Sequence, residues 1–317
     1  MSLAASALLS PPVLCFGLGA LATFLRSNLR LPAPVFEAIS IYLLLSIGLK
    51  GGAELSETSF AAFGPPALAA LGLCVAIPFW SYAALRRIAG FSSADAASMA
   101  AHYGSVSAVT FIAVTSYLEA RAIPHEGFMT AILALMETPA ILIALVLARQ
   151  AGQGGSIGDA LKEVVSAKSF LLLVGGLVIG GLIGKSGLAP VRPFFGDLFL
   201  GLLCLFLLEL GVVAAGRAED ALRAGKTLLL FAIGAPILHG ALGVALGAAA
   251  GLSQGGAIVL GTLAASASYI AAPAAVRLAL PEANAACSLA AALAITFPFN
   301  ILIGIPLYAA IAGQIYG

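Results

Sequence analysis

The sequence predicts an all-α membrane protein with ten transmembrane helices, arranged as two inverted repeats of five helices. Composition is the first observation: of 317 residues, 61% are hydrophobic and only 9% are charged. Soluble domains carry about 25% charged residues, so this chain cannot cover a surface that faces water. The second observation is that ten apolar segments, each of about the 20 residues that a span needs, fill nearly the whole chain. The third is a weak internal repetition between the two halves of the chain.

The ten segments follow from breaks at charged residues and at clusters of proline and glycine. The N-terminal segment lacks the positive region of a signal peptide and stays apolar up to Arg26, so we interpret it as the first span. Residues 149–168 are rich in Gly and Ser and then amphipathic, which is typical of a linker. The predicted domains are therefore residues 1–148, the linker 149–168 and residues 169–317. The predicted spans are 9–25, 35–52, 61–84, 94–117, 127–148, 169–187, 193–214, 225–250, 255–279 and 285–312.

The distribution of positive charge gives the expected orientation. Loops after odd-numbered spans hold eleven Lys and Arg residues, whereas loops after even-numbered spans hold three, Arg121, Lys185 and Arg192. Lys50 is the remaining one of the 15 and lies inside a span. Cytoplasmic loops carry the excess of Lys and Arg in membrane proteins. Both termini are therefore expected outside, and the linker 149–168 is expected in the cytoplasm.

The internal repetition is clearest between the fourth and ninth spans. "AHYGSVSAVTF" in one and "LAASASYIAAP" in the other each place Ser-x-Ser in mid-span, at Ser105 and Ser107 and at Ser266 and Ser268. Each motif is followed by a short loop with proline and then by a span with a Thr-Pro or Thr-Phe-Pro step. Matching interrupted spans in inverted repeats are the best sequence pointer to the binding site of a secondary transporter.

Hydroxyl groups and a helix break at membrane depth need a cavity or a protein partner, because lipid offers no hydrogen bonds. We expect spans 4 and 9 to be discontinuous at residues 104–108 and 265–270 and to cross near the membrane midplane. Their second half-helices then start there, with free N–H groups and the positive end of the helix dipole. Two such starts form a pocket that suits a small anion. The alternative is that the serines bond back to carbonyl groups in unbroken helices.

Glu137 lies in the middle of the fifth span, one residue before Thr138-Pro139. Ionisable residues inside a membrane are costly, and by default they mark functional sites. The carboxylate, the Thr138 hydroxyl and the carbonyl freed by Pro139 are oxygen ligands of the kind that hard cations such as sodium take. The alternatives are a structural ion pair of Glu137 with Lys50, or a pair of Lys50 with Glu209 at the end of the seventh span.

Other classes of function find little support. The sequence has no Gly-rich phosphate loop, no pair of histidines at metal-ligand spacing and no G-x-S-x-G motif, so we expect no enzyme and no cofactor. A net charge of +1 predicts no nucleic-acid partner. The four cysteines lie apart in apolar segments and are expected to be packing residues. His102 and His239 are expected to be packed and hydrogen-bonded rather than part of a proton relay.

With these motifs in view, the chain resembles the sodium-dependent bicarbonate transporter family, which includes the cyanobacterial high-affinity bicarbonate permeases. The similar stretches follow the same order along nearly the whole chain: "LLLSIGLKGG", "YGSVSAVTF", "METPAIL", "GAPILHG" and "AASASYIAAPAAVRLALPEANAACSLAAALAITFP". The resemblance implies two inverted five-helix repeats, a core that moves against a gate, a homotrimer and a bacterial inner membrane. It also implies co-transport of bicarbonate with sodium, and it allows a PII-like regulatory protein to bind on the cytoplasmic face.

The resemblance assigns candidate site residues to the two crossings. Candidate substrate-binding residues are Gly104, Ser105, Val106, Ser107, Ser266, Ala267, Ser268 and Tyr269. Candidate sodium ligands are Glu137, Thr138, Ser268 and Thr296. Tyr269 departs from the family pattern, because the bicarbonate permeases carry an aspartate at this position.

The sequence thus predicts a sodium-coupled symporter of a small anion, with bicarbonate as the first candidate and an elevator-like mechanism. The departure at Tyr269 favours, as one alternative, a sodium- or proton-coupled carrier of a small organic anion. A second alternative is a membrane sensor that keeps this fold and does not transport.

Overall fold

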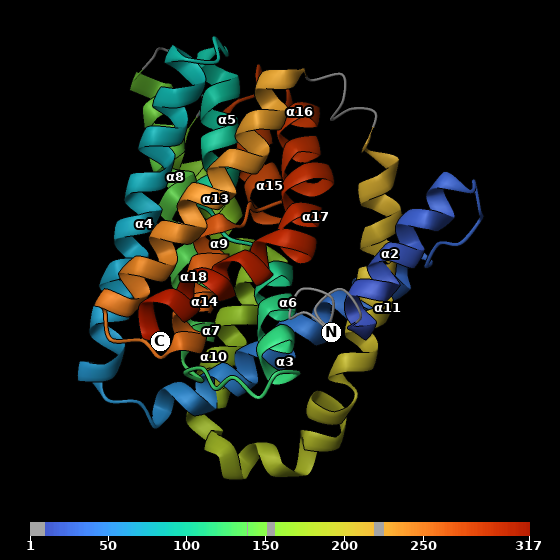
Figure 1. Ribbon diagram of the computed structural model, residues 1–317, viewed down its shortest axis with the longest axis vertical. Helices are drawn as coiled ribbons and strands as arrows, with labels where there is room; N and C mark the ends of the chain where they lie inside the picture. Colours follow the sequence, from blue (N-terminus) through green and yellow to red (C-terminus); the bar gives the residue numbers. More distant parts are fainter. Residues whose placement is uncertain (1–9, 138, 151–155, 219–224) are drawn as a thin grey trace.

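The computed structural model describes residues 10–137, 139–150, 156–218 and 225–317 (Figure 1). Of the residues in these ranges, 83% are helical, and none of them forms a strand. The expected all-α class is therefore confirmed. It follows from composition, because backbone groups in lipid must be satisfied within the segment that carries them.

Within the described ranges, eight segments are long and apolar enough to cross a membrane, where the sequence predicts ten spans. Two further apolar helices are shorter, α2 (Pro11–Phe24) and α14 (Gln254–Ala265). After a non-helical stretch, α14 is followed by α15 (Ala271–Ala279), and α9 (Ile157–Ser166) lies within the expected linker. The eight segments are α3 (Ala33–Ser56), α4 (Phe60–Arg87), α5 with α6 (Ser93–Glu119), α7 with α8 (Met129–Arg149), α10 with η1 (Lys168–Val191), α11 (Phe199–Gly216), α13 (Lys226–Ala249), and α16 through α18 (Ala285–Tyr316).

The helices fall into two groups. We call α2, α3, α10 and α11 the panel, because α3 packs along α10, α2 packs along α11, and α11 also contacts α3. The remaining spanning helices, α4 to α8 and α13 to α18, pack mainly on each other and form the core group. In Figure 1, α2 and α11 lie side by side at the right of the view, apart from the core helices α4 and α5. The panel reaches the core group chiefly where α3 and α10 contact α7 (Met129–Glu137).

Glycine allows the panel helices to approach closely in both pairs. A Cβ atom on Gly180 of α10 would lie 2.1 Å from the Leu49 carbonyl oxygen of α3. A Cβ atom on Gly211 of α11 would lie 2.1 Å from the Phe16 carbonyl oxygen of α2. Small residues hold membrane helices together because they let the backbones touch, where no hydrophobic effect favours association. The panel therefore consists of two helix pairs, each packed closely at glycine residues.

Replacing Gly180 with alanine is expected to lower the free energy of unfolding by about 1–3 kcal/mol, because the backbones of α3 and α10 must move apart. Gly175 on the same helix is the matched control, since a Cβ atom there meets nothing within 4 Å. Gly175→Ala should leave stability unchanged or raise it by about 0.5–1 kcal/mol. Denaturation in detergent measures both changes. Equal stability of the two variants would contradict the close approach at Gly180.

Loops from the two halves of the chain meet at each end of the molecule. At one end, Asp95, in the first turn of α5, accepts a hydrogen bond of 2.7 Å from the Asn284 N–H before α16. At the other end, Glu126 accepts one of 2.6 Å from the Ser253 N–H before α14. Ser253 also caps α14 by accepting from the Gly256 N–H. The loops that meet at each end are the ones that the charge distribution places on one side of the membrane.

Candidate functional site

Two core segments leave helical geometry at the Ser-x-Ser motifs. The first lies between α5 (Ser93–Gly104) and α6 (Ala108–Glu119), and the second lies between α14 and α15, at residues 266–270. The first residue after each helix is extended, with φ −88° and ψ 162° at Ser105 and φ −78° and ψ 164° at Ser266. The two motifs therefore end their helices in the same backbone conformation.

The two interruptions bind each other through backbone groups. The Ser107 N–H donates to the Ser266 hydroxyl at 2.9 Å, and the Ser268 N–H donates to the His102 carbonyl at 2.7 Å. The His102 ring makes a second hydrogen bond to Ser268. Its Nδ1 lies 2.6 Å from the Ser268 carbonyl oxygen, and it donates because a carbonyl oxygen can only accept. Buried backbone groups need such partners where no water is available. His102 is thus a packed, hydrogen-bonded residue that holds the second interruption against the first.

The hydroxyl groups of the four motif serines fall into two matched roles. Ser105 and Ser266 donate to backbone carbonyls, of Glu137 at 2.7 Å and of Leu263 at 2.7 Å. Ser107 accepts from the Thr110 N–H and Ser268 accepts from the Ala272 N–H, both at 3.2 Å. An accepting serine at this position is an N-cap, which satisfies a free N–H of the first helical turn. Ser107 is therefore the N-cap of α6, whereas Ser268 lies two residues before Ile270, the N-cap of α15, and its hydroxyl satisfies the N–H of the second residue of that helix.

A small cavity lies where these two half-helices start. Its volume is about 10 Å³, which is room for one water-sized species. Leu44 of α3 and Ser169 of α10 belong to the panel, and the other lining residues belong to the core group. The cavity is therefore shared between the two helix groups. The lining residues from the core group are Val106, Ser107, Ala108, Glu137, Ser268, Tyr269, Ile270 and Ala271.

Several polar groups at this cavity have no partner within the described ranges. The hydroxyl groups of Ser169 and Tyr269 are buried and make no hydrogen bond of 3.5 Å or less there, although Ser169 lies beside the Glu137 carboxyl group and Tyr269 lies beside the Ser107 hydroxyl. At the helix starts, the N–H groups of Ala108 and Ala271 likewise have no acceptor. Glu137 is only 8% exposed and lies beside Ser169. Buried polar groups without partners are rare in folded proteins, and they need an explanation such as a bound ion or water.

The cavity offers oxygen ligands and hydrogen-bond donors together. Carboxylate and hydroxyl oxygens, supplied by Glu137, Ser169 and Tyr269, are ligands for hard cations. Free N–H groups at helix starts attract anions. The described residues contain no group of three or more His, Cys, Asp or Glu side chains, which a transition metal would require. The arrangement therefore suits an alkali cation and a small anion rather than a transition metal.

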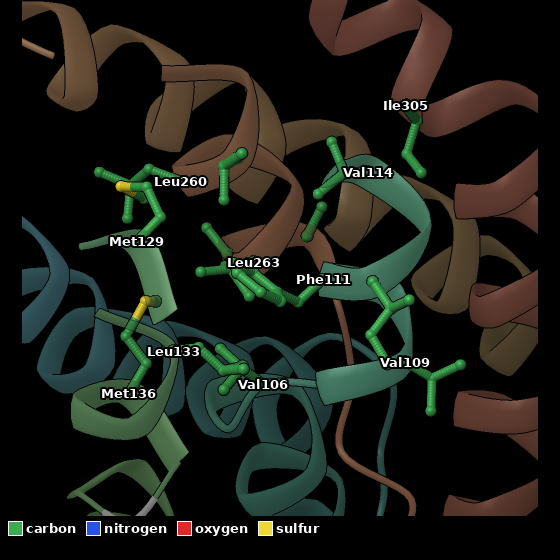
Figure 2. Packing of buried hydrophobic residues seen from close by; sticks show 14 of the residues in the cluster. Val106, Val109, Phe111, Val114, Met129, Leu133, Met136, Leu260, Leu263 and Ile305 are labelled. Atoms are coloured by element: carbon green, nitrogen blue, oxygen red, sulfur yellow. The ribbon is translucent and has the colours of Figure 1, made fainter. Parts of the chain in front are cut away.

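The apolar site residues pack the interruptions in place. Figure 2 shows Val106 near Leu133 of α7, in the cluster of buried side chains that also contains Leu263 of α14. Gly104 must be glycine, because a Cβ atom there would lie 2.5 Å from the ring of Pro78 and 2.8 Å from Ala140. Ala267 is 3% exposed and does not line the cavity.

One of the expected sodium ligands, Thr296, does not line the cavity. Thr296 donates to the Ala232 carbonyl at 2.7 Å and contacts the Tyr103 hydroxyl at 2.6 Å, so its oxygen is already used elsewhere in the core. Thr138 lies outside the described residues. Glu137 and Ser268 do line the cavity together. Tyr269, the departure from the family pattern, packs edge-on against the Phe297 ring with centroids 5.6 Å apart.

The alternative ion pairs of Lys50 are absent from the described part of the chain. The Lys50 ammonium group lies 4.8 Å from the centre of the Phe199 ring, at a different cavity from that of Glu137. Glu209 accepts a hydrogen bond of 2.7 Å from the Leu31 N–H, before the start of α3. Glu137 therefore keeps its carboxyl group for the small cavity.

Sequence reasoning missed two residues that serve this site, Ser169 and Asn300. Asn300 is fully buried, and its amide donates to the Ala265 carbonyl at 2.9 Å, at the end of α14. Its oxygen accepts from the Tyr308 hydroxyl at 3.0 Å. The signal for Asn300 in the sequence was a lone amide side chain within an apolar span. A polar side chain there has a functional or a structural role by default, because it is costly in lipid. Ser169 gave no signal, because its role depends on the panel lying against the core group.

Replacing Asn300 with leucine is expected to lower the free energy of unfolding by about 1–2 kcal/mol, because the Ala265 carbonyl and the Tyr308 hydroxyl both lose a partner. Thr262→Val is the matched control, since the buried Thr262 hydroxyl only bonds back to Ile258 within its own helix. Thermal unfolding of both variants in detergent tests the prediction. A loss in Thr262→Val as large as that in Asn300→Leu would show that any buried hydrogen bond has this effect.

The fold and the site define a multi-pass helical membrane protein, in which two interrupted helices meet at a cavity between two helix groups. The chain belongs to the Na⁺-dependent bicarbonate transporter superfamily, whose family model matches residues 11–313. The family that the sequence motifs resemble is therefore confirmed over almost the whole chain. No curated protein matches the chain. Membership supports a membrane transporter for which sodium and bicarbonate are the family's ions, and it agrees with the expectation that the chain is not an enzyme.

Proposed function

We propose that the protein is a sodium-coupled symporter of a small anion, with bicarbonate as the first candidate substrate. The observation that carries this proposal is the cavity between panel and core group, where two half-helices start and unpartnered polar groups converge. Secondary transporters of this design bind their substrates at interrupted helices near the membrane midplane. The family supplies the identity of the two ions.

We propose ten spans for the membrane topology, with α2 as the first and α14 with α15 as the ninth. Residues 1–148 and 169–317 then form two inverted five-helix repeats, joined by the cytoplasmic linker 149–168, and the interrupted spans cross near the midplane. The matching backbone at Ser105 and Ser266 and the paired loops support this arrangement. Both termini then face outside a bacterial inner membrane. A homotrimer and a PII-like partner rest on the family resemblance alone.

Glu137 is proposed to hold sodium together with oxygen atoms of Ser268 and Tyr269, and Thr138 stays a candidate ligand. A carboxylate that is buried this deeply is costly unless a cation neutralises it. The unpartnered hydroxyl groups of Tyr269 and Ser169 point to a missing ligand at the same place. Because Ser169 belongs to the panel, the bound ion would contact both helix groups.

The same carboxylate explains why anion binding would depend on sodium. An anion at the N–H groups of Ala108 and Ala271 would lie next to Glu137, which repels it unless a cation lies between them. A cavity of about 10 Å³ is too small for bicarbonate, so the core group and the panel must separate before the anion enters. Movement of the core group against the panel is an elevator-like mechanism of alternating access.

Tyr269 supports the main alternative to a bicarbonate symporter. Its phenol ring brings apolar surface to the cavity, and it packs against Phe297. This surface favours a small organic anion as the substrate, with sodium or protons as the coupling ion. A sensor that does not transport is the remaining alternative, favoured by the closed cavity.

Uptake into proteoliposomes separates these functions. Radiolabelled bicarbonate should accumulate with an inward sodium gradient and should not accumulate when choline replaces sodium. A panel of small carboxylates, measured with a sodium gradient and then with a proton gradient, tests the organic-anion carrier. Binding of sodium without uptake of any of these anions would exclude the symporter and favour the sensor.

A further inference from the structure

Lys50 is a charged residue that makes no ion pair in the described part of the chain, although the carboxylates of Glu119 and Asp197 lie near enough to attract it. It lies near the outer end of α3, within a segment long enough to span a membrane, and its ammonium group lies over the face of the Phe199 ring. The panel's other described ion pairs are complete, such as Lys168 with Glu37 at 2.6 Å and Lys185 with Glu57 at 2.8 Å. An unpaired ammonium group at this depth is costly, so it marks a place where an anion binds.

Lys50 faces a cavity of about 390 Å³ between the panel and the core group, which we call the vestibule. Three other titratable residues line it, Glu54, Glu119 and His125. Glu54 is paired with Lys185 at 3.1 Å. Burial lowers the pKa of the His125 imidazole, which Glu119 and Glu126 partly oppose, so His125 is neutral at pH 7. Lys50 is therefore the positive charge in this vestibule, and Glu119 on the opposite wall is the free negative charge.

The vestibule leads to the small cavity along two helix faces. On α3, Leu44 lines the small cavity, and Ile47 lines the vestibule with Lys50. On α6, Ala108 lines the small cavity and Phe111 lines the vestibule. Residues three or four apart lie on one face of a helix, so the two spaces are about one turn, or 5.4 Å, apart. Ile47 and Phe111 are 5% and 4% exposed and close the way between them.

We propose that Lys50 is a reception site for the transported anion, a small oxyanion of the bicarbonate or carboxylate class. The vestibule has room for an anion with its water, whereas the small cavity has not, so the anion binds at Lys50 before it loses its hydration. Glu119 gives the co-transported cation an attractive charge in the same space. The identity of the anion rests on the proposed function, but the charge selectivity of the vestibule does not.

Transport kinetics test the site in proteoliposomes at saturating sodium. Lys50→Met should raise the KM for bicarbonate about fivefold and leave the maximal rate within a factor of two, because a charged cleft concentrates its ion before binding. Lys50→Arg should restore the KM. Lys168→Gln is the matched control, since it removes an exposed positive charge of the panel that lines neither of the cavities that Lys50 lines, and its KM should stay unchanged. An unchanged KM in Lys50→Met would overturn the proposal.

A second measurement does not require transport. Thr115 lines the vestibule on α6, and Thr115→Cys in a chain whose four native cysteines are replaced by alanine provides a label site. The measured quantity is the reaction rate of anionic sulfonatoethyl methanethiosulfonate divided by that of the cationic trimethylammonium reagent. This ratio should be about fivefold higher when Lys50 is present than in Lys50→Met. Bicarbonate should slow the anionic reagent only when Lys50 is present. An equal ratio with and without Lys50 overturns the proposal, whereas charge selectivity without any uptake overturns the proposed function alone.

Discussion

Leucine at Ser107 or at Ser268 is expected to abolish anion uptake, by about a hundredfold or more. Both residues line a cavity of only about 10 Å³ at the start of a half-helix. A leucine side chain there fills the space that the ions need, and displacement of a binding group by 1 Å can cost about 100-fold in rate. Initial rates of sodium-driven uptake in proteoliposomes measure the effect.

Alanine at the same positions is the control for lost hydrogen bonds. Ser107→Ala removes the N-cap of α6, and Ser268→Ala removes the hydroxyl that accepts from the Ala272 N–H in the first turn of α15. Each should lower the free energy of unfolding by about 0.5–2 kcal/mol. They leave the backbone N–H groups in place, so uptake should fall but persist. Thermal unfolding of all four variants shows whether a loss of uptake reflects a blocked cavity or an unfolded protein. Full uptake by both folded leucine variants would place the ion site elsewhere.

Glu137→Gln is expected to remove the dependence on sodium, because glutamine keeps the shape of the side chain and loses the charge that holds the cation. Sodium at 100 times its Kd stabilises a folded protein by about 2.7 kcal/mol, so the wild-type melting temperature should rise with sodium concentration. The melting temperature of Glu137→Gln should not respond. Choline chloride at equal ionic strength is the control for salt.

Tyr269→Asp extends this test of sodium coupling. It places a second carboxylate at the cavity where Tyr269 now has an unpartnered hydroxyl group, so sodium should stabilise this variant more than the wild type. Melting temperatures over a sodium titration measure both effects. Melting temperatures that ignore sodium in the wild type and in Tyr269→Asp would refute sodium symport and would favour proton coupling or a sensor.

The position of the site could be read from the sequence because it depends on local features. A pair of serines in the middle of an apolar segment is costly in lipid, whatever the tertiary fold. Such pairs occur at Ser105 and Ser107 and again at Ser266 and Ser268. In the structure these residues end one helix and start the next, as helix-capping chemistry requires. Glu137 was equally visible, because a carboxylate in an apolar span needs a partner.

The partners of these residues could not be read from the sequence. His102 was interpreted as a packed histidine, but its contact with Ser268 joins residues that are 166 positions apart. Thr296 carries the expected oxygen, yet its neighbours in space are Tyr103 and Ala232, which use that oxygen. The alternative pair of Glu137 with Lys50 is absent from the described structure for the same reason, because the two residues line different cavities.

The sequence by itself determined that this protein is helical, that it lies in a membrane and that it interrupts two apolar segments at serine motifs. These properties depend on composition and on residues a few positions apart, so they hold before any tertiary contact forms. The tertiary structure decided that the two interruptions hydrogen-bond to each other, that Ser169 of the panel faces Glu137, and that Lys50 lines the vestibule together with Glu119. Those facts depend on which helix faces pack together, and close packing of many apolar helices is set by long-range shape that no local pattern encodes.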